Sequence, residues 1–510
     1  MVLLLILQFV TILYFCNCKE GFHYDECYSY YSSNATNALF VPENDWKDCE
    51  EIRSEFQVRK GDRLNYGLVN QMQSLDVHPP LYYFLLHTVC GMSKGIFSKW
   101  QGLSINLLFF VLSWIFLAKI TRILTDSRLA VFSVCLLYGF SPAVYSGITF
   151  IRMYMMLTFE CFLMLYFHLR ALKNRQFSWG KFFIPVLILS FAGFYTHYYF
   201  AVFLFFLAVP TFFYLLLQKG SRIRSLYYGG SVVLGLGLVV CVYPACLGHI
   251  FRGYRGEEAM DAFFSAGNFA ERFNFFYNLT GEYAFGGLLS VTLLVLVLLC
   301  ITNHMLRKIH GTAPAYPFTK EEGLLLFLIA GYFTVVAKTA LLNAEEAIRY
   351  EMPIYGPVTV IIVTGLFHQC RNLGAYLKNG HPGEKFVWPE YAALLVAAVI
   401  LAGEIYGLTQ KKVCFLYEED RAGVEWASDH KDEAVAYIYN PSNLWMVWDE
   451  APELMQYGQI YFCSGEAENI QPDDILLNAE EIYVYAMRGE QAEKQLEMIC
   501  RENDTEGSCE

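Results

Sequence analysis

Residues 199–217 read YFAVFLFFLAVPTFFYLLL, an apolar stretch with no charged side chain. A helix needs roughly 17–25 such residues to cross the hydrocarbon core of a bilayer, which is about 30 Å thick. The composition agrees, because 55% of the 510 residues are hydrophobic, 17% are charged and the mean hydropathy is +0.33. Ten further runs are similar, at 2–17, 100–121, 128–146, 150–172, 181–197, 226–247, 283–306, 322–342, 353–370 and 388–408. The sequence therefore predicts an all-α polytopic membrane protein with about eleven transmembrane helices.

The distribution of Lys and Arg predicts the topology, because short cytoplasmic loops are enriched in these residues. Basic residues gather at 119–128, 170–181, 219–224, 307–320 and 371–385. These loops alternate along the chain if the apolar stretch 81–91 lies along the outer interface as an amphipathic helix. The amino terminus is then inside, and residues 18–99, 248–282 and 409–510 are outside. Two alternatives stay open: 81–91 could be another span, and 2–17 could be a cleaved signal peptide.

A change in composition near residue 408 predicts two domains. Residues 1–408 are predicted to form a transmembrane domain that includes the first outer loop at 18–99, and residues 409–510 a small extracytoplasmic α/β domain. Short β-rich runs at 413–416, 434–439, 459–462 and 481–485 and a helical pattern at 490–500 indicate this second domain. The net charge of −12 argues against a nucleic-acid partner, since phosphate binding needs clustered Lys and Arg.

Ionisable residues gather at one face of the membrane in this topology. A charge near the bilayer midplane costs roughly 2.5–3.5 kcal/mol, so the places where charges collect are informative. Short loops confine these residues to one layer, where helix packing brings them into a single cavity. Such a cavity suits general-base catalysis and the stabilisation of a phosphate leaving group. The residues are Asp25, Glu26, Asp76, His78, Arg152, Tyr154, His197, Lys338, Glu345, Glu346, Arg349 and Tyr350.

The stretch Asp76-Val77-His78-Pro79-Pro80-Leu81-Tyr82-Tyr83 is the most specific local pattern. Two prolines in a row end any preceding helix, hold the residues before them extended and can start the next helix. Side chains two residues apart on an extended chain point the same way, so Asp76 and His78 should lie together. This geometry suits a divalent ion or an imidazole oriented by a carboxylate.

Four motifs together resemble the membrane glycosyltransferases of the GT-C superfamily. They are Tyr24-Asp25-Glu26-Cys27-Tyr28, the stretch from Asp76 to Tyr83, Ser141-Pro142 followed by Arg152-Met153-Tyr154, and Thr196-His197-Tyr198-Tyr199. The most similar branch contains the protein mannosyltransferases and the lipid A aminoarabinose transferase. The resemblance covers roughly the first 200 residues well, the Arg349-Tyr350 loop modestly and the tail not at all. It implies transfer of a sugar from a polyprenyl-phosphate donor to a glycan, lipid or protein acceptor on the outer face of the cell membrane, with inversion at the anomeric carbon.

The resemblance also implies roles for single residues. Asp25 matches the family's catalytic base, with Glu26 beside it. Asp76, His78 and His197 match positions that provide metal or donor-phosphate contacts, which makes one divalent metal ion a predicted cofactor. The aminoarabinose branch has Glu-Lys-Pro where this chain has Val77-His78-Pro79, and this departure leaves the metal open.

The leaving phosphate builds up negative charge, and phosphate oxygens favour Arg for its forked donors. The predicted donor-phosphate contacts are His78, Arg152, Lys338, Arg349 and Tyr350.

Two other classes of function compete with the enzyme. Glu160 lies near the middle of a span with no basic residue one turn away, which favours a transporter or a flippase of a lipid-linked sugar. Transporters, however, place their sites at the midplane on broken helices, often in repeated halves. The one-sided cluster and the lack of a repeat favour the enzyme. Residues 409–510 could instead belong to a receptor or scaffold, or could recognise the acceptor.

Overall fold

The computed structural model describes residues 1–35, 45–93, 95–220, 222–265, 267–310, 316–378, 388–440, 447–448, 450–464 and 482–486. The chain divides into two compact units. The helical unit comprises Met1–Cys16, Ser74–Tyr82 and Leu103–Cys414, and the sheet unit comprises Asn17–Gln73, Tyr83–Gly102 and Phe415–Glu510.

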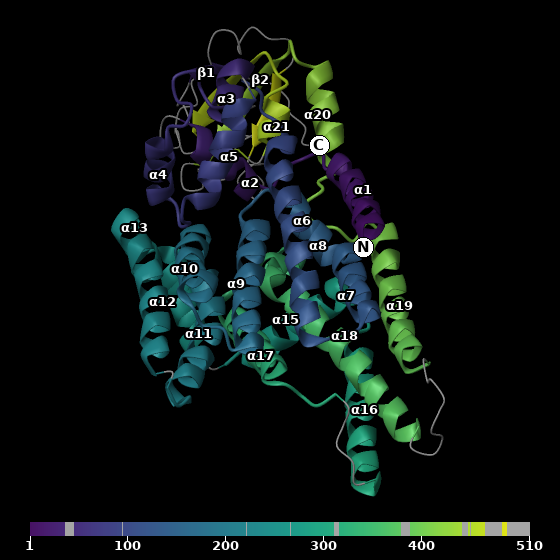
Figure 1. Ribbon diagram of the computed structural model, residues 1–510. Coiled ribbons are helices and arrows are strands. Elements are labelled where there is room, and N and C mark those ends of the chain that lie inside the picture. Colours follow the sequence, from purple (N-terminus) through teal and green to yellow (C-terminus); the bar gives the residue numbers. More distant parts are fainter. Residues whose placement is uncertain are drawn as a thin grey trace. The chain divides into compact units, whose positions relative to one another are not determined.

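Most helices belong to the helical unit (Figure 1). They are α1 (Val2–Cys18), α6 (Lys99–Leu124), α7 (Arg128–Phe140), α8 (Pro142–Thr149), α9 (Tyr154–Asn174), η1 (Trp179–Phe183), α10 (Ile184–Thr196), α11 (Tyr199–Leu217), α12 (Arg222–Val242), α13 (Ala245–Phe251), α14 (Tyr254–Phe264), α15 (Phe269–Ala284), α16 (Leu289–His310), α17 (Lys320–Thr339), η2 (Ala344–Ala347), α18 (Ile348–Lys378) and α19 (Trp388–Thr409).

Within the described residues, nine helices are long and apolar enough to cross a membrane, and the bent pair of α7 and α8 makes a tenth. The pair bends by 50° at Ser141-Pro142, because Pro142 has no N–H with which to continue α7 and instead starts α8. Every predicted span after the first falls on one of these segments, and the first falls on α1, a shorter apolar helix of 17 residues. The chain is a helical, polytopic membrane protein, as predicted.

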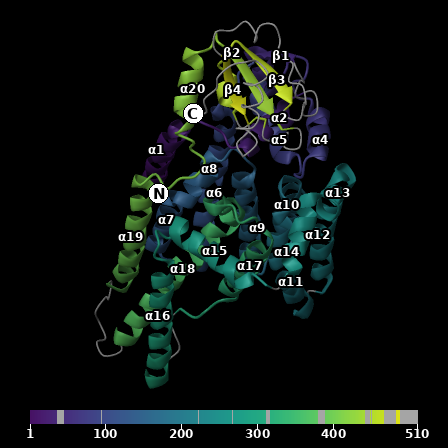
Figure 2. The same ribbon diagram turned by 180° about the vertical axis from the view of Figure 1, so that it is seen from behind.

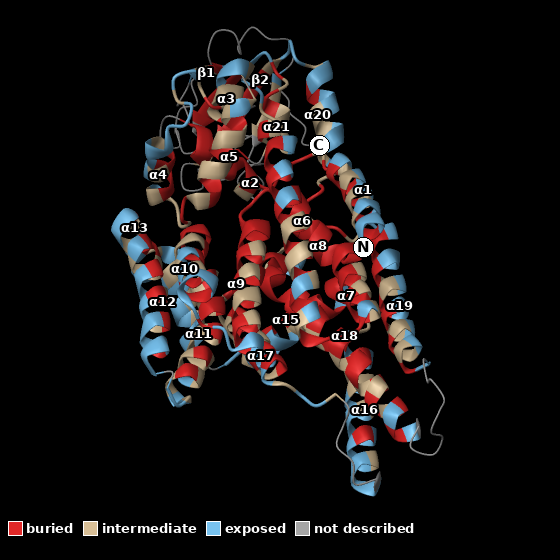
Figure 3. Ribbon diagram, viewed as in Figure 1, coloured by how far each residue is buried: buried red, intermediate tan, exposed pale blue. Residues whose placement is uncertain are grey.

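Helices α9 and α18 form the centre of the helical unit. In α18, 83% of the apolar window is buried, and in α9 72%, against 17% in α16 (Figure 3). The exposed side chains of α16 include Leu294, Val297 and Leu298, which form the kind of apolar surface that hydrocarbon requires. The two central helices begin beside Arg152 and Arg349, so their packing fixes where these predicted site residues lie.

The sheet unit combines the first loop with the tail. Its four strands have the order β1-β3-β2-β4, with β2 parallel to β3 and β4, and β1 antiparallel to β3 (Figure 2). Its elements are α2 (Tyr24–Asn34), β1 (Asp45–Asp48), α3 (Cys49–Glu55), most of α4 (Tyr66–Leu75) and α5 (Leu81–Met92), α20 (Asp420–Asp429), β2 (Ala434–Tyr439), α21 (Ala451–Leu454), β3 (Gln459–Ser464) and β4 (Ile482–Ala486).

The predicted boundary at residue 408 differs from this division. The prediction placed 18–99 with the transmembrane helices, whereas the structure groups most of this loop with the tail because β1 pairs along β3. The stretch at 81–91 forms α5, whose 12 residues would extend about 18 Å, too short to cross a bilayer.

Three of the four strands predicted in the tail are confirmed as β2, β3 and β4. The strand predicted at 413–416 is wrong, because Lys411, Phe415 and Tyr417 have positive φ angles of 54°, 66° and 49°. Left-handed backbone at these positions does not allow a strand. The helix predicted at 490–500 lies outside the described residues.

Candidate active site

The loop before α5 brings Asp76 and His78 together, as the double proline predicted. The Nδ1 atom of His78 lies 3.3 Å from Oδ2 of Asp76, and α5 begins directly after Pro80, at Leu81. The carboxylate of Asp76 is 35% exposed and the imidazole of His78 19% exposed, so both remain open to a ligand.

Arg152 comes to the same place from the turn between α8 and α9. Asn106 on α6 donates hydrogen bonds to the carbonyls of Ile148 and Phe150 at 3.0 and 2.7 Å, which fixes the end of α8. Arg152 follows, 3% exposed, with its Nη2 atom 3.3 Å from Nδ1 of His78. Burial opposes ionisation of Asp76, but the hydrogen bond from His78 and the charges of His78 and Arg152 keep its pKa below the usual value.

His197 lies in the turn between α10 and α11. Its backbone N–H donates to Gly193 O at 3.0 Å, and its Nδ1 accepts a hydrogen bond from the N–H of Tyr199 at 3.1 Å. Its ring is 5.7 Å from that of His78 and 5.4 Å from that of Tyr154. Burial holds the pKa of His197 well below its usual value, and the positive charges of His78, Arg152 and Arg349 act in the same direction. The imidazole is therefore neutral, with its proton on Nε2.

Arg349 and Tyr350 occupy the first turn of α18. The Arg349 side chain is buried, and its guanidinium carbon lies 5.4 Å from the ring of Phe150 and 5.2 Å from the ring of Tyr350. The Tyr350 ring in turn lies 6.1 Å from that of Tyr154. These contacts join the start of α18 to the start of α9. We call Asp76, His78, Arg152, His197 and Arg349, with Tyr154 and Tyr350, the His–Arg cluster.

Lys338 has contacts of a different kind. Its ammonium group donates to the carbonyl of Ser265 and lies 5.5 Å from the ring of Phe269. These contacts tie the end of α17 to Ser265 and to Phe269, the first residue of α15. The role of Lys338 toward a donor phosphate stays a prediction.

The predicted metal ligands do not form a ligand set as they are placed. Across the described ranges there is no group of three or more His, Cys, Asp or Glu side chains that could hold a metal ion. Asp76 and His78 are adjacent, but the guanidinium of Arg152 lies against the imidazole nitrogen that faces Asp76. A cation bound there would be repelled by the charge of Arg152. The divalent ion stays a prediction.

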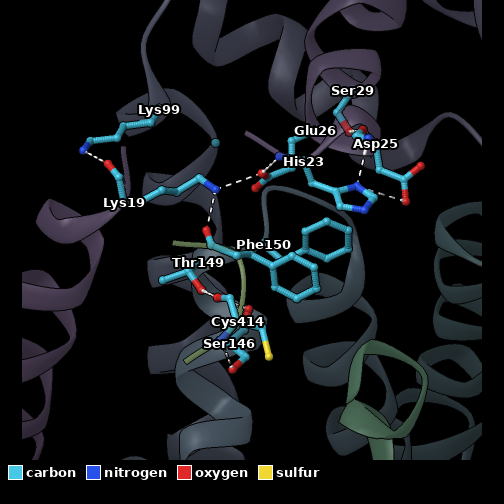
Figure 4. A network of polar contacts seen from close by, with 12 residues as sticks. Lys19, His23, Asp25, Glu26, Ser29, Lys99, Ser146, Thr149, Phe150 and Cys414 are labelled. Carbon is cyan, nitrogen blue, oxygen red and sulfur yellow. Dashed lines mark hydrogen bonds and ion pairs between the residues drawn. The ribbon is translucent and has the colours of Figure 1, made fainter. Parts of the chain in front are cut away.

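Asp25 and Glu26 belong to the sheet unit, in the first turn of α2 (Figure 4). The Asp25 carboxylate is 28% exposed and lies 3.7 Å from Nδ1 of His23. Glu26 is completely buried: its Oε2 accepts hydrogen bonds from Lys19 Nζ at 2.8 Å and from the N–H of His23 at 2.7 Å. Lys19 also donates to Phe415 O at 2.7 Å. Asp25 is therefore available for chemistry, whereas these contacts give Glu26 a structural role and leave its catalytic role a prediction.

Glu160, which favoured a transporter, has a local partner. The hydroxyl of Thr196 donates to its Oε1 atom at 3.1 Å. This bond joins α9 to the end of α10, one residue before His197. The bond satisfies one oxygen of the buried carboxylate, whereas Oε2 has no hydrogen-bond partner among the described residues.

His249 and Asn106 are supporting residues that sequence reasoning missed. His249 on α13 accepts a hydrogen bond from the Tyr198 hydroxyl at 2.8 Å, and its Nε2 lies 3.3 Å from the carbonyl of Ser74, two residues before Asp76. It therefore connects the turn that carries His197 to the loop that carries Asp76. A lone Asn within an apolar span was the available signal for Asn106, but the sequence carried none for the partners of His249.

The fold is similar to that of known membrane glycosyltransferases. The crystal structure of ArnT from Cupriavidus metallidurans bound to undecaprenyl phosphate matches with a TM-score of 0.53 at 12% identity, over 90% of this chain and 85% of that chain. A weaker match, with a TM-score of 0.43 at 11% identity, is the apo oligosaccharyltransferase of Archaeoglobus fulgidus, over 90% of this chain and 64% of that chain. The match to ArnT shows that the fold is of the GT-C type.

A family match agrees with the fold. Residues 77–245, which contain His78, Arg152 and His197, match the family model of the dolichyl-phosphate-mannose-protein mannosyltransferases. Comparison of the sequence with curated proteins gives no significant match. The resemblance to GT-C glycosyltransferases that the motifs predicted is therefore confirmed.

Proposed function

We propose that this protein is a glycosyltransferase that moves a sugar from a polyprenyl-phosphate donor to an acceptor, with inversion at the anomeric carbon. The observation that carries the proposal is the His–Arg cluster, in which two buried guanidinium groups meet two imidazoles beside one carboxylate. Such a set is suited to an anion, and a lipid phosphate is the anion available at the end of a membrane span. The ArnT structure of similar fold holds a polyprenyl phosphate.

The cluster acts on the leaving group. As the bond between the anomeric carbon and the phosphate oxygen breaks, its electron pair passes to the phosphate, whose negative charge increases. Arg152 and Arg349 stabilise this charge, and the loss of one such preorganised contact typically costs about 3–4 kcal/mol. His197, neutral with its proton on Nε2, donates a hydrogen bond to the phosphate.

Asp25 acts on the acceptor. A hydroxyl or amine of the acceptor attacks the anomeric carbon from the face opposite the phosphate, and its proton passes to the Asp25 carboxylate. General-base assistance of this kind contributes about 10²–10⁴ in rate. The products are the glycosylated acceptor and the free polyprenyl phosphate.

The reaction takes place on the outer face of the membrane. The distribution of Lys and Arg supports this orientation, since basic loops lie at the opposite ends of the spans from Arg152 and Arg349. The acceptor is a glycan, a lipid or a protein, and the sheet unit is the part of the chain that recognises it.

The experiment measures release of free polyprenyl phosphate from a mixture of polyprenyl-phosphate sugars by the purified full chain. We expect release by the wild type, a loss of at least about a hundredfold in Asp25→Asn, and no loss in Glu50→Gln, a matched carboxylate whose side chain is 74% exposed. Donor binding without release, unchanged by Asp25→Asn, would instead support the flippase.

A further inference from the structure

A groove of about 560 Å³ lies in the helical unit, between the carboxyl-terminal halves of α6 and α9. One part of its lining is apolar and includes Trp114, Ile115 and Ile123. The other part carries three cations, Lys119 and Arg122 from α6 and Arg170 from α9, together with the amide of Asn174. Its lining contains no carboxylate.

One aromatic ring brings two of the three cations together, although Lys119 and Arg122 are exposed and Arg170 is half-buried. The ring of Tyr166 lies 5.9 Å from Nζ of Lys119 and 5.9 Å from the guanidinium carbon of Arg170. The same ammonium group lies 4.5 Å from the ring of Phe116. Aromatic faces attract cations, but two like charges on one ring also repel each other. An anion bound between them would remove this repulsion.

The groove is far from the His–Arg cluster. Arg152 precedes the first turn of α9 and Arg170 lies in its last two turns. From Tyr154, the first residue of α9, to Arg170 the helix rises over 16 residues, about 24 Å at 1.5 Å per residue. The groove therefore lies at the other end of the spans, beside loops whose basic residues predict the cytoplasmic face. Anionic phospholipid headgroups lie at this depth, and basic pockets between transmembrane helices bind them.

We propose that this groove binds an anionic phospholipid. The lipid phosphate lies between Lys119, Arg122 and Arg170, and the first part of one acyl chain runs along Trp114 and Ile115. The apolar wall excludes a purely polar ligand, and the three cations exclude a zwitterionic lipid as the preferred occupant. The inference is independent of the proposed glycosyl transfer.

The test compares two probes, phosphatidylglycerol and phosphatidylcholine with identical acyl chains, bound to the full-length protein in native mass spectrometry. The groove variant is Lys119→Gln/Arg122→Gln/Arg170→Gln. The matched control is Lys173→Gln/Arg175→Gln/Lys181→Gln, which removes three exposed charges at the same end of the spans but outside the lining.

We expect the wild type to prefer phosphatidylglycerol by at least about tenfold. Each cation near a membrane surface contributes about fivefold to affinity for anionic lipid, so the groove variant should lose about 10²-fold, and the control less than about twofold. If the triple variant does not fold, Arg170→Gln alone should lose about fivefold.

Three results would overturn the proposal. Equal retention of both lipids by the wild type would show that the groove does not select anionic lipid. Equal losses of phosphatidylglycerol affinity in the two triple variants would show that the effect comes from general surface charge. Displacement of the bound lipid by millimolar glycerol phosphate would assign the groove to a free phosphate ester.

Discussion

Replacing Glu26 with Gln should destabilise the sheet unit instead of slowing the chemistry. The Glu26 and Lys19 side chains are both 0% exposed and their charged groups are 2.8 Å apart. The amide of Gln keeps the shape of the carboxylate but leaves the Lys19 ammonium buried without its counter-charge. Breaking one side of a buried pair costs about 3–5 kcal/mol.

The neighbouring substitution provides the contrast. Asp25→Asn removes the same charge one residue earlier, but this carboxylate is 28% exposed and 3.7 Å from His23. A pair of that kind contributes about 0–1 kcal/mol. Asp25→Asn should therefore remain folded while losing transfer. Glu26→Gln should be less stable, but each folded molecule of this variant should still catalyse transfer.

Hydrogen exchange of the α2 amides, followed by mass spectrometry, measures the effect. A loss of about 3–5 kcal/mol speeds exchange through unfolding of this unit by about 10²–10⁴. The double variant Lys19→Met/Glu26→Leu removes both charges and should recover most of the protection. Unchanged exchange in Glu26→Gln, together with a hundredfold loss of transfer, would refute this reasoning and make Glu26 part of the chemistry.

Four further outcomes are expected. In steady-state assays, Arg152→Gln should lower kcat by about 10²–10³. Lys338→Gln removes the same charge, but its kcat should stay within about threefold of the wild type. Equal losses of kcat in the two variants would place Lys338 in the His–Arg cluster. Burial raises the pKa of the Cys414 thiol to about 12. The rate at which this thiol is alkylated, measured by mass spectrometry of the peptide that contains it, should therefore rise about tenfold per pH unit from pH 8 to 10. A plateau of the rate near pH 9 would contradict this. If Arg152 fulfils the role predicted for a metal ion, a chelator of divalent ions should change the rate of transfer by less than about twofold. Loss of activity, together with about one bound ion per chain in metal analysis, would instead support the metal ion. In intact cells, an impermeant maleimide should label a cysteine placed at Glu425 but not one at Lys173, and the opposite result would invert the topology.

The sequence predicts the membrane spans well because their signal is local. The length of an apolar run directly measures whether it can cross hydrocarbon. The pairing of Asp76 with His78 is equally local, since two prolines constrain the chain on which both residues lie. These features need no knowledge of the rest of the fold.

Features that depend on distant partners could not be predicted. In the sequence Glu26 looks like Asp25, its neighbour. Only the structure separates their roles, because Glu26 binds Lys19, and Lys19 also donates to the carbonyl of Phe415, 396 residues further along the chain. Strand β1 has the sequence DWKD, and its three charged residues do not give the hydrophobic pattern that predicts a strand. Charged residues are nevertheless common on edge strands, and β1 lies at the edge of this sheet. For Lys338, the rotation of α17 decides which neighbours the side chain meets, and hydropathy does not determine that rotation.

The pairing of β1 with β3 also determines when the loop that carries Asp25 can finish folding. The ribosome makes about 400 residues between these strands, which takes roughly 20–80 s at 5–20 residues per second. Until then β1 has no partner strand and Lys19 has no Phe415 carbonyl. A chain that stops before residue 415 would carry its proposed base on a half-assembled loop. Removing the tail should therefore abolish transfer whether or not the tail recognises the acceptor, and the two explanations must be separated by point substitutions instead of truncation.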